Sequence, residues 1–142
     1  MKHLSTPLQF FIGLAKVQSV VSRRFDSGLQ GLSFSDFQIL VHLSQAREGK
    51  LRRVDLAEKV GLTASGITRL LAPMEKVGLI KREKHVNDAR VSYVLLAPGG
   101  RRKLEEALEN ADLLSEELLR HVDGKFVKEA STMLGDLGGR SL

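Results

Sequence analysis

The sequence predicts a mainly α fold with one small β-hairpin, and three observations lead to this prediction. Apolar residues recur three and four positions apart over most of the 142-residue chain, which is the spacing of a buried helix face. Two short runs, 79–84 and 91–96, instead alternate between apolar and polar residues well enough to be antiparallel strands. The polar, turn-prone segment 85–90 lies between these runs and would form the tip of the hairpin.

The first two helices are marked by their starting residues. Thr6 offers a capping hydroxyl and Pro7 suits the first helical position, so a helix is expected to start here and to end near Gly28. Its apolar surface is wider than one side of a small domain can cover. Ser33, with Asp36 three positions later, resembles a capping box and predicts a second helix that runs to about Ala46.

Two shorter helices follow a turn at 47–50. The third is expected over about 54–60, with Gly61 as its C-terminal break. Thr63 would cap the fourth helix, which closes at Gly78. Pro73 inside this helix cannot donate a backbone hydrogen bond, so a local kink is expected there, with straight turns before it.

The fourth helix has a divided surface. Its apolar residues recur at helical spacing and are expected to be buried: Ile67, Leu70, Leu71 and Met74. Ser65, Thr68 and Arg69 fall on the opposite side, which is open to solvent or to a partner. Short hydrogen-bonding side chains with one arginine suit a helix that approaches the base edges of DNA closely.

The C-terminal part is expected to form two further helices. A long helix would start at Pro98 and carry an apolar stripe from Leu104 to Val122, broken by Gly124. A shorter last helix would carry apolar residues from 126 to 137. We therefore divide one continuous domain into an N-terminal dimerisation helix (1–32), a winged helix-turn-helix region (33–97) and C-terminal dimerisation helices (98–142).

The positive charge is concentrated in the middle of the chain. Residues 47–103 hold 14 Lys and Arg against 6 Asp and Glu, whereas residues 104–142 hold 4 against 9. A basic region on a helix-turn-helix pattern favours a nucleic-acid partner over an ordinary solvated surface.

Several classes of protein are disfavoured. The chain has no Cys, which rules out disulfides and thiolate metal sites, and its four His show no metal-ligand spacing. No catalytic set of residues or phosphate-binding glycine loop is visible, so we expect neither an enzyme nor a cofactor. No apolar run approaches a membrane span and no signal peptide is recognisable, so a cytoplasmic location without membrane contact is expected.

The chain resembles the multiple antibiotic resistance regulator (MarR) family of winged-helix repressors. The resemblance is most specific in LTASGITRLLAPMEKVGLIKRE (62–83) and in NDARVSYVLLAPGG (87–100), where Asp88-x-Arg90 is similar to the family's wing-tip signature. It implies a homodimer, paired through its outer helices, that binds a pseudo-palindromic stretch of double-stranded DNA. It also implies release of DNA by a small anionic or phenolic effector, as in many members. Ala64, Pro73 and Ala97 depart from residues that are common in the family.

The resemblance and the residue pattern together give a set of candidate DNA-binding residues. By resemblance, Arg90 enters the minor groove, Asp88 anchors it, and the exposed side of the fourth helix reads the major groove. Basic residues of the ribbon would flank them on phosphates, although alternation means that they cannot all face one way. The full set is Arg53, Ser65, Thr68, Arg69, Lys81, Arg82, Lys84, Asp88 and Arg90.

The alternatives for these residues stay open at this point. Arg69 can bind a guanine edge or a phosphate, or it can be a surface charge paired with Glu75 or Asp55. Ser65 and Thr68 can contact phosphates or a thymine methyl group, or simply be exposed. Arg53, with its neighbour Arg52, can contact the DNA backbone or be solvated.

The terminal apolar stripes are assigned to dimerisation. They can also belong to the core or line a ligand pocket, and a role in core or dimer packing is the commoner one for any given residue. The residues assigned to the dimer are Phe10, Phe11, Leu14, Leu114, Leu118, Phe126, Met133 and Leu134.

We therefore expect a sequence-specific DNA-binding transcriptional regulator, with repression as the default. The alternative is a winged-helix module that binds another protein, for which the acidic segment 104–129 would be a docking helix.

Overall fold

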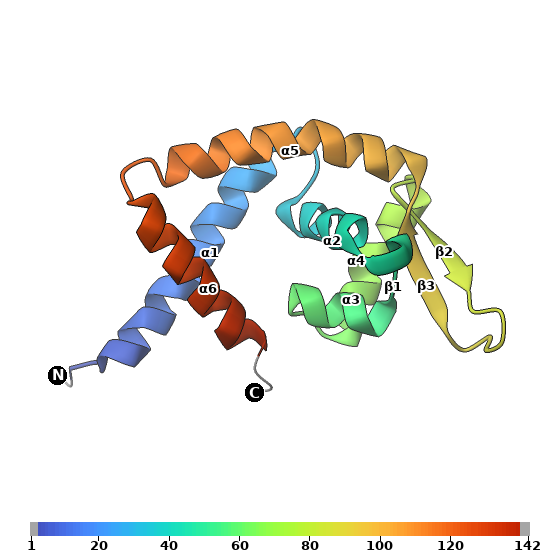
Figure 1. The fold of residues 1–142 in the computed structure, drawn as a ribbon, viewed down its shortest axis with the longest axis horizontal. Coiled ribbons are helices and arrows are strands. Elements are labelled where there is room, and N and C mark those ends of the chain that lie inside the picture. Colours follow the sequence, from blue (N-terminus) through green and yellow to red (C-terminus); the bar gives the residue numbers. More distant parts are fainter. Residues whose placement is uncertain (1–2, 140–142) are drawn as a thin grey trace.

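The computed structural model describes residues 3–139, in which six α-helices accompany a small three-stranded antiparallel sheet (Figure 1). Helix α5 runs along one edge of the molecule. Helix α6 follows the C-terminal end of α5, and the C-terminal end of α1 packs against the C-terminal half of α5, while α2, α3, α4 and the sheet lie toward its N-terminal end. The predicted fold class is confirmed: a mainly α chain with a winged helix-turn-helix between N- and C-terminal helices.

Helices α1 (Thr6–Gly28) and α2 (Phe34–Gln45) begin at serine caps. The predicted cap at Thr6 was wrong by one residue, because the Ser5 hydroxyl accepts the Leu8 N–H and Thr6 is already helical. The Ser33 cap was predicted correctly, since its hydroxyl accepts the Asp36 N–H at 3.0 Å.

A third strand, which the sequence analysis did not predict, follows a 3-10 turn at Arg47–Gly49. Strand β1 (Lys50–Arg52) pairs antiparallel with β3, placing Leu51 opposite Val94. Three residues are too few to reveal alternation, and the partner strand lies more than forty positions away. The expected hairpin is therefore part of a sheet with strand order β1-β3-β2.

Helices α3 (Arg53–Val60) and α4 (Ala64–Lys76) form the helix-turn-helix. Gly61 ends α3 with a φ of 77°, a left-handed conformation that glycine adopts without steric cost. Thr63 caps α4 by accepting the Gly66 N–H at 3.1 Å. Helix α4 continues through Pro73 to Lys76. Of the four apolar residues predicted to be buried, Ile67, Leu71 and Met74 are buried, while Leu70 is only half-buried against the core.

The wing consists of β2 (Ile80–Lys84), β3 (Ser92–Leu96) and the loop between them. Ile80 pairs with Leu96 and Lys84 with Ser92, so the register places Ile80, Val94 and Leu96 on the core side. The strand positions agree with prediction to within one residue at each end.

Helices α5 (Pro98–Leu118) and α6 (Gly124–Gly139) complete the fold. The apolar stripe suggested one helix up to Val122, but α5 ends at Leu118 and a turn covers residues 119–122. Asp123 accepts the Lys125 N–H at 2.9 Å, so α6 begins at Gly124. Helix α5 begins without a side-chain cap, because Ala97 at its N-cap has no hydrogen-bonding side chain.

The core lies between α2, α3, α4, α5 and the inner face of the sheet, with the end of α1 closing it. Its largest fully buried side chains are Leu29, Leu32, Ile39, Leu40, Leu43, Leu56, Ile67, Leu71, Met74, Ile80 and Val94. Burial, and then nearby Lys59, lower the pKa of His42 on α2, which keeps this imidazole neutral at pH 7.

The start of α5 packs directly on the backbone where α4 leads into the wing. A Cβ added at Gly100 would lie 1.9 Å from the carbonyl oxygen of Leu79, and one at Gly99 would lie 2.8 Å from that of Gly78. The Leu79 carbonyl also accepts the Ala97 N–H at 3.0 Å. This close approach gives the two glycines a packing role, and it fixes the wing relative to α5.

The terminal helices contrast with this core. Helix α6 has no buried residue, and Phe25 is the one buried residue of α1. Phe126 is 62% exposed, and Phe10, Phe11, Met133 and Leu134 are exposed as well. Over residues 3–139, no helix combines the length and apolar character needed to cross a membrane.

Candidate nucleic-acid interface

The first turns of α4 present a polar surface on the side opposite the core. Ser65 and Arg69 are exposed and Thr68 is half-buried, whereas Ile67 and Leu71 between them are fully buried. The Thr63 hydroxyl bonds both the Gly66 N–H and the Ser65 hydroxyl, which fixes the start of the helix. The predicted division of α4 into a buried and an open side is thus present in the structure.

Arg69 has no ion-pair partner among residues 3–139. The two acids that the sequence offered as partners are taken by other arginines: Asp55 by Arg52, and Glu75 by Arg82. The guanidinium of Arg69 is therefore available on the open side of α4.

Two consecutive arginines at the start of α3 have different surroundings. Arg52 donates from Nε to Asp55 Oδ2 at 2.8 Å and from Nη2 to Asp55 Oδ1 at 3.2 Å. This bidentate hydrogen bonding raises the pKa of Arg52 and balances its charge locally. Arg53 instead reaches across to α4 and donates from Nη1 to the hydroxyl of Thr68 at 3.1 Å.

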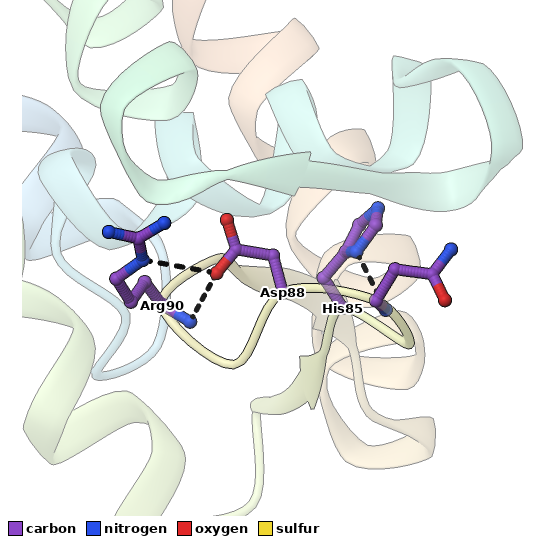
Figure 2. A network of polar contacts seen from close by, with 4 residues as sticks. His85, Asp88 and Arg90 are labelled. Carbon is purple, nitrogen blue, oxygen red and sulfur yellow. Dashed lines mark hydrogen bonds and ion pairs between the residues drawn. The ribbon is translucent and has the colours of Figure 1, made fainter.

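At the wing tip, Asp88 and Arg90 form the local pair that the resemblance implies (Figure 2). Oδ1 of Asp88 accepts both the backbone N–H of Arg90, at 3.0 Å, and its Nε, at 3.3 Å. Nδ1 of His85 accepts the backbone N–H of Asn87 at 3.1 Å, which braces the same loop. The Arg90 side chain is 92% exposed, so it projects from a turn whose backbone is held by hydrogen bonds.

The basic residues of β2 lie on both faces of the ribbon, as alternation requires. Arg82 and Lys84 share a face with buried Ile80, and Lys81 lies on the other face. Arg82 is engaged by Glu75 of α4, and this ion pair ties the wing to the helix. On the outer face, Lys50 pairs with Glu83 at 3.2 Å and lies over the ring of Tyr93.

A small hollow joins the helix-turn-helix to the wing. It has a volume of about 170 Å³ and three arginines contribute to its wall. The residues that line it are Arg52, Arg53, Val54, Ala64, Arg90, Val91 and Ser92. Arg90 and the start of α3 share one hollow although they are almost forty residues apart, which local sequence patterns do not predict. The antiparallel pairing of β1 with β3 brings them together.

The predicted dimer residues fall into two groups. Phe10, Phe11, Phe126, Met133 and Leu134 are exposed on α1 and α6. The remaining three are half-buried: Leu14, Leu114 and Leu118. Leu114 and Leu118 pack in part on the chain's own core, and Leu114 lies close to Gly28 of α1.

Comparison with known proteins agrees with this geometry. The model of the MarR family matches residues 32–92. The repressor YetL of Bacillus subtilis, described as an HTH-type transcriptional repressor, is 30% identical over 92% of this chain and 79% of its own length. YdgJ of the same organism, described as an uncharacterized HTH-type transcriptional regulator, is 28% identical over 79% of this chain and 66% of its own length.

Solved structures share the whole fold. Sco3205, a MarR family transcriptional regulator from Streptomyces coelicolor solved in complex with DNA, superposes with a TM-score of 0.80 at 20% identity, covering 96% of this chain and 89% of that one. NadR, solved in complex with 4-hydroxyphenylacetate, gives a TM-score of 0.82 at 23% identity, covering 99% of this chain and 100% of that one.

Proposed function

Because this chain belongs to the MarR family of DNA-binding transcriptional regulators, we propose that two copies of it bind one pseudo-palindromic operator and repress transcription there. Each copy places the open side of α4 in a major groove and the wing tip, with Arg90, in the adjacent minor groove. Two-fold symmetry then sets the two half-sites about 10 base pairs apart, or at a multiple of that distance.

One observation carries this proposal: the start of α3, the first residue of α4 (Ala64) and the wing at Arg90 line a single recess to which three arginines contribute. Arg53 and Arg90 come from its two walls, and the recess between them holds about 170 Å³. A phosphate placed there receives charge-assisted hydrogen bonds from Arg53, while Arg90 extends into the minor groove, and this contact fixes the register of α4 on the duplex. Ser65, Thr68 and Arg69 then face the base edges. Lys81, Arg82 and Lys84 add positive charge on both faces of the wing, so those on the face turned to the DNA contact its backbone.

The dimer is proposed from the terminal helices. Aromatic and aliphatic side chains lie exposed on α1 and α6, and a second copy that covers them removes this apolar surface from water. Both helices extend away from the wing, on the side of the C-terminal half of α5, so pairing through them leaves both wings free (Figure 1). We accordingly propose residues 1–32 and 98–142 as dimerisation segments and 33–97 as the DNA-binding region.

The affinity for duplex DNA is expected to fall steeply with salt. If the dimer neutralises six phosphates, the logarithm of the association constant falls against the logarithm of salt concentration with a slope of about −5. Fluorescence anisotropy with a labelled duplex of selected sequence, between low and physiological salt, measures this slope. The alternative function, a module that binds another protein, predicts no binding to duplex at any of these concentrations. It also leaves the basic recess without a role, because such a module would dock through the acidic segment 104–129.

A charge placed in the proposed dimer seam is expected to separate the two copies. Phe126→Glu puts a carboxylate where the partner's apolar surface would lie, and burying a charge without a partner costs several kcal/mol. Sedimentation velocity should show a monomer, and operator affinity should drop at least tenfold. Val77→Glu is the matched control for the sedimentation measurement, because Val77 is 70% exposed and lies at the end of α4, outside the proposed dimer interface. If the F126E protein remains dimeric, Phe126 on α6 does not lie in the dimer interface.

An effector is proposed on the same basis. We propose that a small anionic or phenolic molecule binds between the terminal helices and the DNA-binding region. The dimer then has two conformations that differ in the spacing of its wings, and the molecule shifts the equilibrium toward the conformation that it binds more tightly. One support is the fold shared with NadR, whose structure contains 4-hydroxyphenylacetate. A hollow of about 780 Å³ between α3 and the end of α6 gives such a position. Asp55, Glu58 and Lys59 line it, so it suits a neutral phenol better than an anion.

A further inference from the structure

The hydroxyl of Thr68 already makes two hydrogen bonds inside the protein. Oγ1 donates its hydrogen to the carbonyl oxygen of Ala64, one turn back in α4, at 2.9 Å. The same oxygen accepts a hydrogen bond from Nη1 of Arg53 at 3.1 Å. A threonine hydroxyl has one hydrogen and two lone pairs, so its only donor and one of its acceptor sites are taken.

These two bonds decide which part of Thr68 is presented to a partner. The bond to Ala64 turns Oγ1 toward the helix backbone, and the Arg53 guanidinium holds it from the side, so the side chain has one preferred rotamer. Donating to a base edge would require the hydroxyl to give up its bond to Ala64, and only one lone pair is left to accept a hydrogen bond. The γ-methyl group makes no hydrogen bond and remains available for an apolar contact. The half-buried side chain lies on the same side of α4 as exposed Ser65 and Arg69.

We propose that Thr68 reads a thymine in each half-site through apolar contact between its γ-methyl group and the C5-methyl group of the base. Thymine is the one standard base that presents a methyl group in the major groove, so such a contact distinguishes it from the other three. Arg53 is the positioning residue that keeps the hydroxyl turned away. This inference rests on the proposed placement of α4 in the major groove.

Arg53 can do this while it also holds a phosphate. A guanidinium has five N–H donors in a fixed plane, and the bond to Thr68 uses one of them. The remaining donors are open to the recess that Arg53 and Arg90 line. Arg53 thereby contacts the DNA backbone and orients Thr68 at the same time. A lysine, which carries a point charge and no planar set of donors, does not do both.

Deleting the base methyl group without changing base pairing tests the contact directly. The full-length protein is titrated against its selected operator and against duplexes in which each thymine, one symmetric pair at a time, is replaced by deoxyuridine. Loss of one buried methyl contact corresponds to about a fourfold weakening per half-site. We expect one symmetric pair of thymines in the α4 contact region to show this loss.

Three variants identify the protein side of the contact. Thr68→Val keeps the methyl group and removes the hydroxyl, so it should keep the preference for thymine over uracil at that pair. Thr68→Ser keeps the hydroxyl and removes the methyl group, so it should bind both duplexes equally. Arg53→Ala should weaken binding overall and also reduce the thymine preference, whereas an arginine that only binds phosphate would weaken both duplexes by the same factor.

The outcomes separate this inference from the proposed function. Full thymine preference in T68S, or its loss in T68V, overturns methyl readout by Thr68. If no replacement of thymine by uracil anywhere in the operator changes the affinity, methyl readout is overturned as well. Specific binding to the operator would in that case still support the proposed function as a DNA-binding regulator. Failure of the parent protein to bind duplex even at low salt overturns the proposed function itself.

Discussion

Gly100→Ala is expected to destabilise the folded chain by about 3 kcal/mol or more, or to prevent it from folding, since overpacking of this severity exceeds what an interior normally absorbs. The added Cβ would lie 1.9 Å from the carbonyl oxygen and 2.9 Å from the carbonyl carbon of Leu79. Both atoms belong to the backbone, so no side-chain rotation relieves the clash. The first turn of α5 has to move away from the start of the wing.

That movement disturbs more than one contact. The Leu79 carbonyl accepts the Ala97 N–H, and Ile80, the next residue, is fully buried opposite Leu96. Separating α5 from this backbone strains the hydrogen bond and opens the core at the base of the wing. A loss of operator binding by G100A would then follow from the loss of the folded state.

Two other glycines supply the comparison. Gly99→Ala places its Cβ 2.8 Å from the Gly78 carbonyl and should cost less, whereas Gly124→Ala meets nothing within 4 Å and should be nearly neutral. Urea unfolding followed by circular dichroism at one fixed protein concentration gives the three midpoints. A G100A midpoint close to that of G124A would contradict the packing that we assign to Gly100.

The parts of the fold that were predicted correctly are those that depend on residues close together in the chain. The Ser33 and Thr63 caps, the Gly61 break and the two wing strands each follow from side chains within one turn of the feature they set. Strand β1 was missed because its three residues are defined only by pairing with β3. The end of α5 was misplaced because apolar residues at helical spacing continue through the turn at 119–122, where the chain reverses toward α6.

The same distinction holds for the candidate interface. The Asp88–Arg90 pair is a contact between residues two positions apart, and the open side of α4 is a matter of helix periodicity, so both follow from the sequence. The bond between Arg53 and Thr68 joins residues fifteen positions apart, and the recess joins Arg53 to Arg90. Only the packing of α3 on α4 and the pairing of β1 with β3 create these contacts. We predicted from the sequence that Arg53 lies near DNA, but not that it donates a hydrogen bond to Thr68.

Arg90→Ala is expected to weaken operator binding by about one to two orders of magnitude, the effect of losing a contact worth about 1–3 kcal/mol. The wing holds this side chain ready, because Asp88 Oδ1 bonds both its backbone N–H and its Nε while the guanidinium stays 92% exposed. A narrow A·T-rich minor groove concentrates negative potential, so an inserted guanidinium gains most there. The loss should therefore be larger on operators with A·T-rich flanks than on G·C-rich ones.

The controls separate charge, position and folding. Arg120→Ala removes the same charge from the turn that follows α5, at the end of that helix far from the wing, and should leave affinity nearly unchanged (Figure 1). Asp88→Ala frees the guanidinium without removing it, so it should cost a few-fold at most, through lost preorganisation. Because Arg90 is almost fully exposed, R90A should unfold within about 0.5 kcal/mol of the parent. Equal affinity of R90A and the parent on both kinds of flank would remove the wing tip from the interface and leave α4 to read DNA alone.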